Sequence, residues 1–181
     1  MLGGMTTPRA LVVNGTVGSG KTTTIEHVGD LLAEAGRPHA LVDLDWLRKG
    51  WPPPLDDAFN SELELTNLRA VTAGFHAAGM SDLVLAGVIE DPALLPRYAQ
   101  ALGCTPTVVR LRVDLDWLHD RLAARHADDT EAREWHQRRC GELHAILEQT
   151  RSREHVVDVA PGEAPRQVAV RVLQAAGWMA R

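Results

Sequence analysis

Residues 10–22 of this chain read ALVVNGTVGSGKT. Within this stretch, Gly15 to Thr22 matches the phosphate-binding pattern G-x-x-x-x-G-K-[ST] at every fixed position. The glycines let the backbone curl so that successive N–H groups point inward, where they and the following helix N-terminus attract phosphate oxygens. The spacing lets Lys21 reach the β- and γ-phosphates of a nucleotide and lets the Thr22 hydroxyl ligate Mg²⁺. We therefore predict a P-loop that binds ATP together with Mg²⁺.

The surroundings of the pattern make it specific, because an apolar run precedes it and an amphipathic helical pattern follows it. A glycine-rich turn without a ligand is the alternative, and it leaves Lys21 and Thr22 unexplained. The predicted nucleotide-binding residues of the loop are Gly15, Thr16, Val17, Gly18, Ser19, Gly20, Lys21, Thr22 and Thr23.

Short runs rich in valine or leucine have the pattern of strands that are covered on both faces. They span residues 10–14, 39–43, 82–89, 107–113 and 155–159. Helical patterns separate or follow them at residues 21–35, 56–78, 91–102, 115–126, 131–150 and 164–179. Strands that alternate with helices imply a parallel sheet with right-handed crossovers. The predicted fold is α/β, a three-layer P-loop NTPase fold with a five-stranded parallel sheet and helices on both faces.

The chain has 181 residues, 45% of them hydrophobic, so we expect residues 1–181 to form a single domain. The net charge of −5 and the lack of a long basic run argue against nucleic acid or a membrane as partner. No apolar run reaches the roughly 20 residues that span a bilayer, and residues 1–9 lack a signal-peptide pattern. We expect a cytoplasmic protein, monomeric or homodimeric, in which Cys104 and Cys140 are reduced and buried or half-buried.

Several motifs beyond the P-loop resemble those of adenylylsulfate kinase and its relatives among small-molecule kinases. Residues 42–48, VDLDWLR, are similar to the Asp-x-Asp and following Arg at the end of that family's second strand. Residues 67–69, Asn-Leu-Arg, resemble the family's substrate helix, with Phe59 eight residues before the Asn, and residues 88–92 resemble the loop after strand three. The resemblance touches most of the first hundred residues. It implies a kinase that phosphorylates a hydroxyl group of a small molecule, with acceptor-binding residues Asp45, Arg48, Glu64, Asn67 and Arg69.

Two positions depart from this family's pattern. Glu64 stands where the family has an Arg three residues before the substrate-helix Asn, and Trp46 replaces the Asn that follows the Asp-x-Asp. The first change reverses a charge, and both weaken the case for adenylylsulfate as the acceptor. An acidic, aromatic pocket formed by Glu62, Glu64, Trp46 and Trp51 would suit a neutral polyol or a cation better.

Residues 121–125, RLAAR, resemble the Arg-x-x-x-Arg at the lid of nucleotide and related kinases. In those kinases the first Arg packs on adenine and the second meets phosphates. Residues four apart share a helix face, so Arg121 and Arg125 can point to one site, although an exposed basic helix face is the alternative. We expect a short lid around residues 121–139, from which an arginine (Arg133, Arg138 or Arg139) returns to the phosphates.

Phosphoryl transfer requires positioning and charge neutralisation more than covalent chemistry. We assign catalysis to Lys21, Asp45 and Arg125, with Asp45 accepting the proton of the acceptor hydroxyl. Thr22 and Asp43 are the predicted Mg²⁺ residues, because Asp43 ends the second strand, where open α/β sheets bind ligands. Helix capping is the alternative for both aspartates, and Asp45, directly before Trp46, is well placed for it.

Two other classes of protein fit the P-loop. One is a regulatory or accessory protein that binds a nucleotide without transferring phosphate, and it has no need of a hydroxyl-facing base such as Asp45. The other is a nucleotide or polynucleotide kinase, of which the polynucleotide kinase predicts a basic groove that the net charge of −5 disfavours. Ala86 and Gly87 stand where motor and AAA ATPases carry a Walker B acid, which favours the kinase branch.

Overall fold

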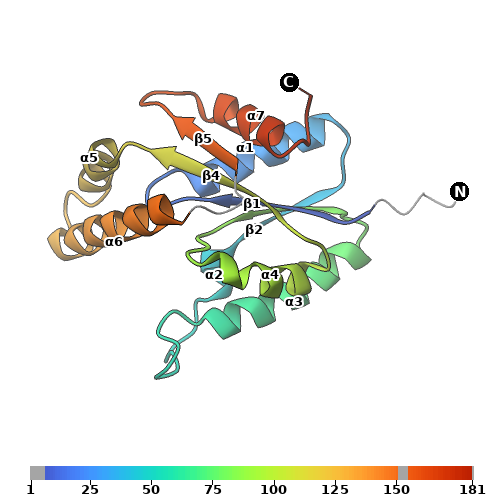
Figure 1. The fold of residues 1–181 in the computed structure, drawn as a ribbon, viewed down its shortest axis with the longest axis horizontal. Helices are drawn as coiled ribbons and strands as arrows, with labels where there is room; N and C mark the ends of the chain where they lie inside the picture. Colours follow the sequence, from blue (N-terminus) through green and yellow to red (C-terminus); the bar gives the residue numbers. More distant parts are fainter. Residues whose placement is uncertain (1–6, 151–154, 181) are drawn as a thin grey trace, which may run out of the picture.

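A computed structural model describes residues 7–150 and 155–180 of the chain (Figure 1). Residues 1–6, which belong to the segment expected to lack a signal peptide, lie outside the described residues.

The centre of the molecule is a five-stranded parallel sheet with the strand order β2-β3-β1-β4-β5. Its strands are β1 (Arg9–Asn14), β2 (His39–Asp43), β3 (Asp82–Ala86), β4 (Thr107–Val113) and β5 (His155–Val159). In the central strand, Val12 pairs with Leu85 of β3 on one side and with Val108 of β4 on the other. Because all strands run parallel, their carboxyl ends share one edge of the sheet, and the P-loop begins at that edge.

Helices cover both faces of this sheet. They are α1 (Lys21–Glu34), α2 (Leu44–Leu47), α3 (Ser61–Ala77), the 3₁₀ helix η1 (Pro92–Leu94), α4 (Leu95–Leu102), α5 (Leu115–Arg125), α6 (Thr130–Gln149) and α7 (Pro165–Ala175). Figure 1 shows α1 and α7 on one face, α2, α3 and α4 on the other, and α5 and α6 beside the carboxyl end of β4. The predicted three-layer α/β fold is confirmed.

The core follows from the alternation of side chains along each strand. Leu11 and Val13 of β1 are fully buried in the cluster that includes Val28 of α1, whereas Val12 is buried in the cluster that includes Leu68 of α3. The central strand β1 is therefore apolar on both faces, which explains its continuous apolar run in the sequence. The described part of the chain has no helix with the length and apolarity that a membrane crossing requires.

Several boundaries differ from the sequence prediction. The third strand ends at Ala86, because Gly87 passes so close to α2 that a Cβ on it would lie 2.5 Å from the Leu44 side chain. The helix predicted from residue 56 begins at Ser61, after Asn60 adopts a left-handed conformation (φ 53°). The predicted helix at 91–102 is divided into η1 and α4, and the short helix α2 follows β2 directly. These changes leave residues 48–60 as a loop beside the carboxyl edge.

Candidate functional site

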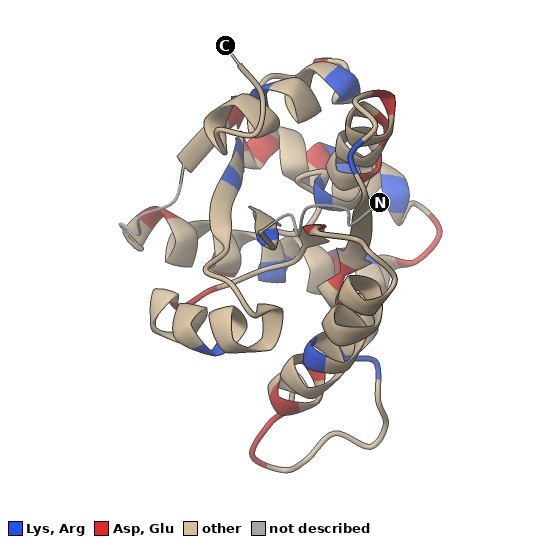
Figure 2. Ribbon diagram, turned by 90° about the vertical axis from the view of Figure 1, so that its right-hand side faces the viewer, with Lys and Arg blue, Asp and Glu red and all other residues tan. Residues whose placement is uncertain are grey.

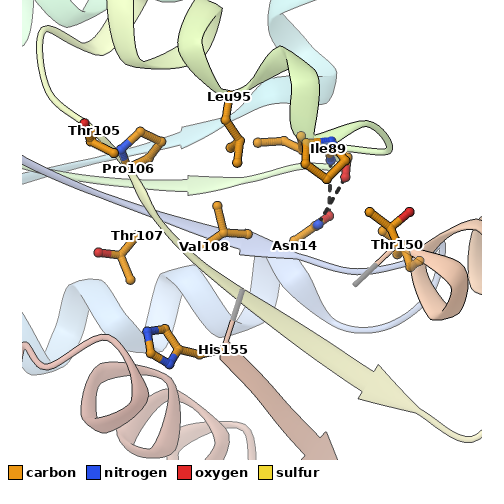
Figure 3. A pocket seen from close by; sticks show the side chains of 11 residues that line it. Asn14, Ile89, Leu95, Thr105, Pro106, Thr107, Val108, Thr150 and His155 are labelled. Carbon is orange, nitrogen blue, oxygen red and sulfur yellow. Dashed lines mark hydrogen bonds between the residues drawn. The ribbon is translucent and has the colours of Figure 1, made fainter. Parts of the chain in front are cut away.

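The P-loop is fastened at its start by the side chain of Asn14, the last residue of β1. The Asn14 Oδ1 accepts hydrogen bonds from the backbone N–H of Gly15 (2.9 Å) and of Ile89 (3.2 Å), and its Nδ2 donates to the Ile89 carbonyl (3.2 Å). Figure 3 shows Asn14 reaching across to Ile89. This contact joins the beginning of the P-loop to the segment after β3, so the two loops at the carboxyl edge are held together.

The glycines of the loop occupy positions that other residues could not. Gly18 and Gly20 have φ angles of 80° and 92°, which L side chains rarely adopt. A Cβ on Gly15 would lie 2.7 Å from the Ser19 hydroxyl, which is buried and has no hydrogen-bond partner among the described residues. A curled backbone with a buried, unpaired hydroxyl fits a phosphate cradle, in which the ligand would supply the missing partner.

Lys21 lies across this loop. Its ammonium donates hydrogen bonds to the carbonyls of Gly15 (2.9 Å) and Thr16 (3.0 Å). Burial lowers the pKa of Lys21, while the carboxylates of Asp45 and Asp43 offset part of this effect. The cation is therefore held at the mouth of the loop, between the phosphate cradle and the two aspartates that end the second strand.

Thr22 and Asp43, the predicted Mg²⁺ residues, are in direct contact. The Thr22 hydroxyl donates to the Asp43 Oδ2 at 2.8 Å, so two oxygen ligands of the kind that Mg²⁺ prefers lie together. Within the described residues, no group of three or more His, Cys, Asp or Glu side chains is arranged to hold a metal ion. A site with one hydroxyl and one carboxylate suits Mg²⁺ that takes its other ligands from phosphates and water.

The two aspartates of the Asp-x-Asp motif differ in their contacts. Asp43 is the N-cap of α2, since its Oδ1 accepts a hydrogen bond from the backbone N–H of Asp45 (3.0 Å). The capping alternative was therefore right for Asp43 and wrong for Asp45, which lies two residues further on, in the first turn of α2. Asp45 is exposed, and its carboxylate makes the largest electrostatic contribution that raises the pKa of Lys21. Its charge therefore favours the protonated form of Lys21.

Between the end of α2 and α3, Arg48 and Glu64 form an ion pair. The Arg48 Nε lies 2.6 Å from the Glu64 Oε2, which also accepts from Nη2, and the Tyr98 hydroxyl donates to the Glu64 Oε1 (2.6 Å). Glu64 is completely buried, whereas the Arg48 side chain is 24% exposed. Burial and the Glu64 carboxylate raise the pKa of Tyr98, which keeps this hydroxyl protonated as a donor. The Glu64 carboxylate is therefore enclosed by Arg48 and Tyr98, and its expected role in binding the acceptor stays a prediction.

The remaining residues of the predicted acceptor site have different surroundings. The Asn67 Nδ2 donates to the Leu47 carbonyl (2.8 Å) and ties α3 to the end of α2. Arg69 is exposed on α3. Asn60, which the sequence analysis did not single out, donates to the carbonyls of Arg48 and Gly50 (2.9 Å each) and closes the base of the 48–60 loop.

The helices of the predicted lid contact the P-loop from the other side. The side chains of Leu118 and Leu122 of α5 contain the atoms nearest to a Cβ placed on Gly18, with a Leu122 carbon at 3.4 Å. Arg121 and Arg125 are both exposed on this helix, and the Arg121 guanidinium lies 4.9 Å from the ring centroid of Trp117. The structure thus positions the helix that carries these arginines beside the phosphate loop, while their proposed contacts with nucleotide stay predictions.

Helix α6 closes the site from the side of the third strand. The Thr16 hydroxyl donates to the Cys140 carbonyl (2.9 Å), and the Cys140 thiol is buried. The neighbouring Arg139 donates to Glu90 (2.5 Å), in the segment after β3, and its guanidinium lies 5.1 Å from the ring centroid of Phe59. Among the lid arginines left open by the sequence, Arg139 therefore joins α6 to the segment after β3 and to Phe59, while a contact with phosphates stays a prediction.

A hollow of about 340 Å³ lies beneath the carboxyl end of β1 (Figure 3). Its wall is mostly apolar and comes from η1, α4, β4 and the ends of α6 and β5, with Leu95, Val108 and Leu147 among its residues. Asn14 borders it, but its side chain is occupied by Gly15 and Ile89. Figure 2 shows acidic and basic residues interspersed along the ribbon, without a continuous basic stripe over the described residues in that view.

Solved structures share this fold along nearly the whole chain. The tunicamycin resistance protein of Deinococcus radiodurans superposes with a TM-score of 0.64 and 20% identity over 95% of this chain and 97% of that chain. The APS kinase of Mycobacterium tuberculosis, in complex with AMPPNP and APS, gives 0.58 and 22% over 93% and 98%. A gluconokinase of Sinorhizobium meliloti 1021 gives 0.57 and 17% over 94% and 92%. Neither the models of known protein families nor the curated proteins give a match.

These likenesses show that the chain has the fold of P-loop kinases. At 17–22% identity these similarities show the fold alone. What distinguishes this chain lies in its own residues at the carboxyl edge, where Lys21, Thr22, Asp43 and Asp45 come together.

Proposed function

We propose that this protein is an ATP-dependent phosphotransferase that transfers the γ-phosphate of ATP to a hydroxyl group of a small molecule. The observation that carries the proposal is the hydrogen bond between Thr22 and Asp43 at the end of the P-loop, together with the exposed carboxylate of Asp45 two residues further on. A nucleotide cradle, a hydroxyl–carboxylate pair for a divalent cation and a separate acid on the open side are what such a transfer needs.

Each residue has a defined task in this proposal. The backbone amides of residues 15–21 bind phosphate oxygens, and Lys21 neutralises negative charge on the transferred group. Thr22 and Asp43 hold Mg²⁺, which when bound supplies further positive charge to the phosphates. Asp45 accepts the proton of the attacking hydroxyl.

The α5–α6 region completes the site on the nucleotide side. Arg121 and Arg125 bind the nucleotide from α5, in keeping with the position of this helix against Gly18. Arg139 holds α6 to the acceptor side through Glu90. Residues 121–139 act in this proposal as a short lid that excludes water.

We do not favour adenylylsulfate as the acceptor. Glu64 replaces the arginine that the resemblance predicts there, and this carboxylate is buried and paired with Arg48 and Tyr98. The exchange therefore removes a cation from the acceptor side without adding a free anion to the cleft. A neutral hydroxyl compound fits this surrounding better than an anion.

A regulatory protein that binds ATP without transferring phosphate is the second candidate. The exposed Asp45 argues against it, because a carboxylate beside the phosphate cradle repels a bound polyphosphate unless it has a task in the reaction. The test is transfer of labelled γ-phosphate to a panel of hydroxyl compounds by the natural chain, by Asp45→Asn and by Asp56→Asn, an exposed loop acid that serves as the control.

We expect transfer to at least one acceptor, a loss of about 10²-fold or more in Asp45→Asn, and no change in Asp56→Asn. ATP binding without transfer to any acceptor would favour the regulatory protein. Equal rates for Asp45→Asn and the natural chain would remove Asp45 as the base.

A further inference from the structure

The loop between α2 and α3 exposes an unusual amount of apolar surface. Among the described residues, eight large hydrophobic side chains are exposed, and five of them lie between residues 46 and 63. Trp51, Leu55 and Phe59, which we call the apolar loop, are more than half exposed, with Trp51 at 92%. A concentration of exposed large apolar side chains of this kind marks a binding surface in most soluble proteins.

The apolar loop is a built structure. Asn60 closes its base through the carbonyls of Arg48 and Gly50, and three prolines follow Trp51, which restricts its backbone. At its far end, the Asp57 carboxylate accepts hydrogen bonds from the backbone N–H groups of Ser61 (2.8 Å) and Glu62 (3.0 Å). The loop therefore presents its apolar side chains in a defined arrangement.

The position of the loop connects it to the transfer site. Its first end follows α2, which carries Asp45, and its second end brings Phe59 to Arg139 of α6, whose partner Glu90 comes from the segment after β3. Figure 1 shows the loop projecting below α2 and α3, on the side of the sheet where α6 also lies. The two ends of the loop therefore lie at α2, which carries Asp45, and beside α6.

The charges around the loop favour an uncharged partner. Two arginines on this side are each bound to a carboxylate, Arg97 to Glu62 (2.7 Å) and Arg139 to Glu90 (2.5 Å), as Arg48 is to Glu64. Paired groups of this kind have little net charge with which to attract an anion.

We propose that the acceptor is an uncharged hydroxyl compound with an aromatic or alkyl substituent, and that the apolar loop binds this substituent while the hydroxyl lies at Asp45. This inference rests on the proposed function and narrows its substrate class. One buried methylene changes affinity about fourfold, so contact with only two of them gives roughly fifteenfold.

The test compares methyl, phenyl and octyl β-D-glucoside, which share the same hydroxyls and differ in the apolar substituent. Binding to the full chain, saturated with Mg²⁺ and a non-hydrolysable ATP analogue, is measured by equilibrium dialysis with octyl glucoside below its micelle concentration. The natural chain is compared with Trp51→Ser/Leu55→Ser, in which both changed side chains are exposed, and with the control Trp135→Ser, an exposed tryptophan of α6.

We expect phenyl and octyl glucoside to bind at least tenfold more tightly than methyl glucoside to the natural chain and to Trp135→Ser. In the double variant this ratio should fall below about threefold. Equal binding of all three, no binding of any, or an unchanged ratio in the double variant overturns the proposal.

Two further measurements distinguish a failure of the proposed function from a failure of this inference. Binding of the ATP analogue is measured in the same samples: its absence contradicts the proposed function and this inference with it, whereas its presence without discrimination among glucosides contradicts only the apolar acceptor. Sedimentation of the natural chain and of the double variant tests whether a second copy of the chain, rather than the acceptor, covers the apolar loop. A dimer that dissociates in the double variant would assign the apolar loop to a second copy of the chain and overturn the proposal.

Discussion

Replacement of Glu64 by alanine should destabilise the protein strongly, although Glu64 touches neither the P-loop nor Asp45. Glu64 is completely buried and accepts hydrogen bonds from Arg48 and from the buried Tyr98 hydroxyl. Removal of one partner of a buried ion pair costs about 3–5 kcal/mol. The lower end applies here, because the Arg48 side chain is 24% exposed and can turn toward water.

The unpaired Tyr98 hydroxyl adds about 1 kcal/mol, which gives about 4 kcal/mol in total. For a chain of this length, that corresponds to a fall in Tm of roughly 8–16 °C. Glu64→Gln keeps the size of the side chain and an acceptor for the Tyr98 hydroxyl, so it should lose about half as much.

The natural control for this experiment is Glu62, two residues earlier in the same helix. Glu62 also binds an arginine in a two-pronged ion pair, with Arg97, but both side chains are largely exposed. Exposed pairs contribute little, so Glu62→Ala should leave the Tm nearly unchanged. Thermal unfolding followed by circular dichroism checks all three variants. If Glu62→Ala and Glu64→Ala lower the Tm equally, the reasoning from burial is refuted.

Three further changes test the rest of the site. Asp43→Asn keeps the helix cap but removes the charge beside Thr22, so we expect the transfer rate to fall about 10²-fold with a change in Tm of only a few degrees; an unaltered Mg²⁺ dependence would contradict this. Thr16→Val removes the hydrogen bond to the Cys140 carbonyl and should lower the free energy of unfolding by about 1 kcal/mol. A thiol reagent should then label the buried Cys140 faster than in the natural chain. An unchanged labelling rate would contradict the idea that this hydrogen bond holds α6 against the P-loop. Asn60→Gly permits the left-handed backbone but releases the base of the loop, so chymotrypsin should cleave after Phe59 sooner than in the natural chain, whereas equal cleavage would show that the loop is ordered by other contacts.

Much of the fold could be predicted because its signals are local. The central strand β1 contains the continuous apolar run from Ala10 to Val13, and the pattern from Gly15 to Thr22 fixes both the end of this strand and the start of the first helix. The prediction failed where distant residues decide the boundary. The third strand stops at Ala86 because Gly87 has to pass α2, a contact between segments more than forty residues apart.

In the candidate site, too, the features set by neighbouring residues could be predicted, and those set by distant residues could not. The phosphate loop depends on residues within one stretch, whereas Tyr98 binds Glu64 across a separation of 34 positions and Arg139 binds Glu90 across 49. No spacing in the sequence indicates such pairs, so Glu64 was expected to face the acceptor. Asn14 offered a weak signal, as a polar residue that ends an apolar strand directly before the loop, and Asn60 offered none.

The division of tasks between the two aspartates follows from the chemistry of one carboxylate. Asp43 has two oxygens, and the structure uses both: Oδ1 caps α2 and Oδ2 accepts from Thr22. Because a helix of only four residues begins directly after β2, its first turn carries Asp45 past the cap position, where its side chain is exposed. A longer connection would have let either aspartate cap the helix. The immediate start of α2 therefore keeps Asp43 at the P-loop and leaves the Asp45 carboxylate exposed.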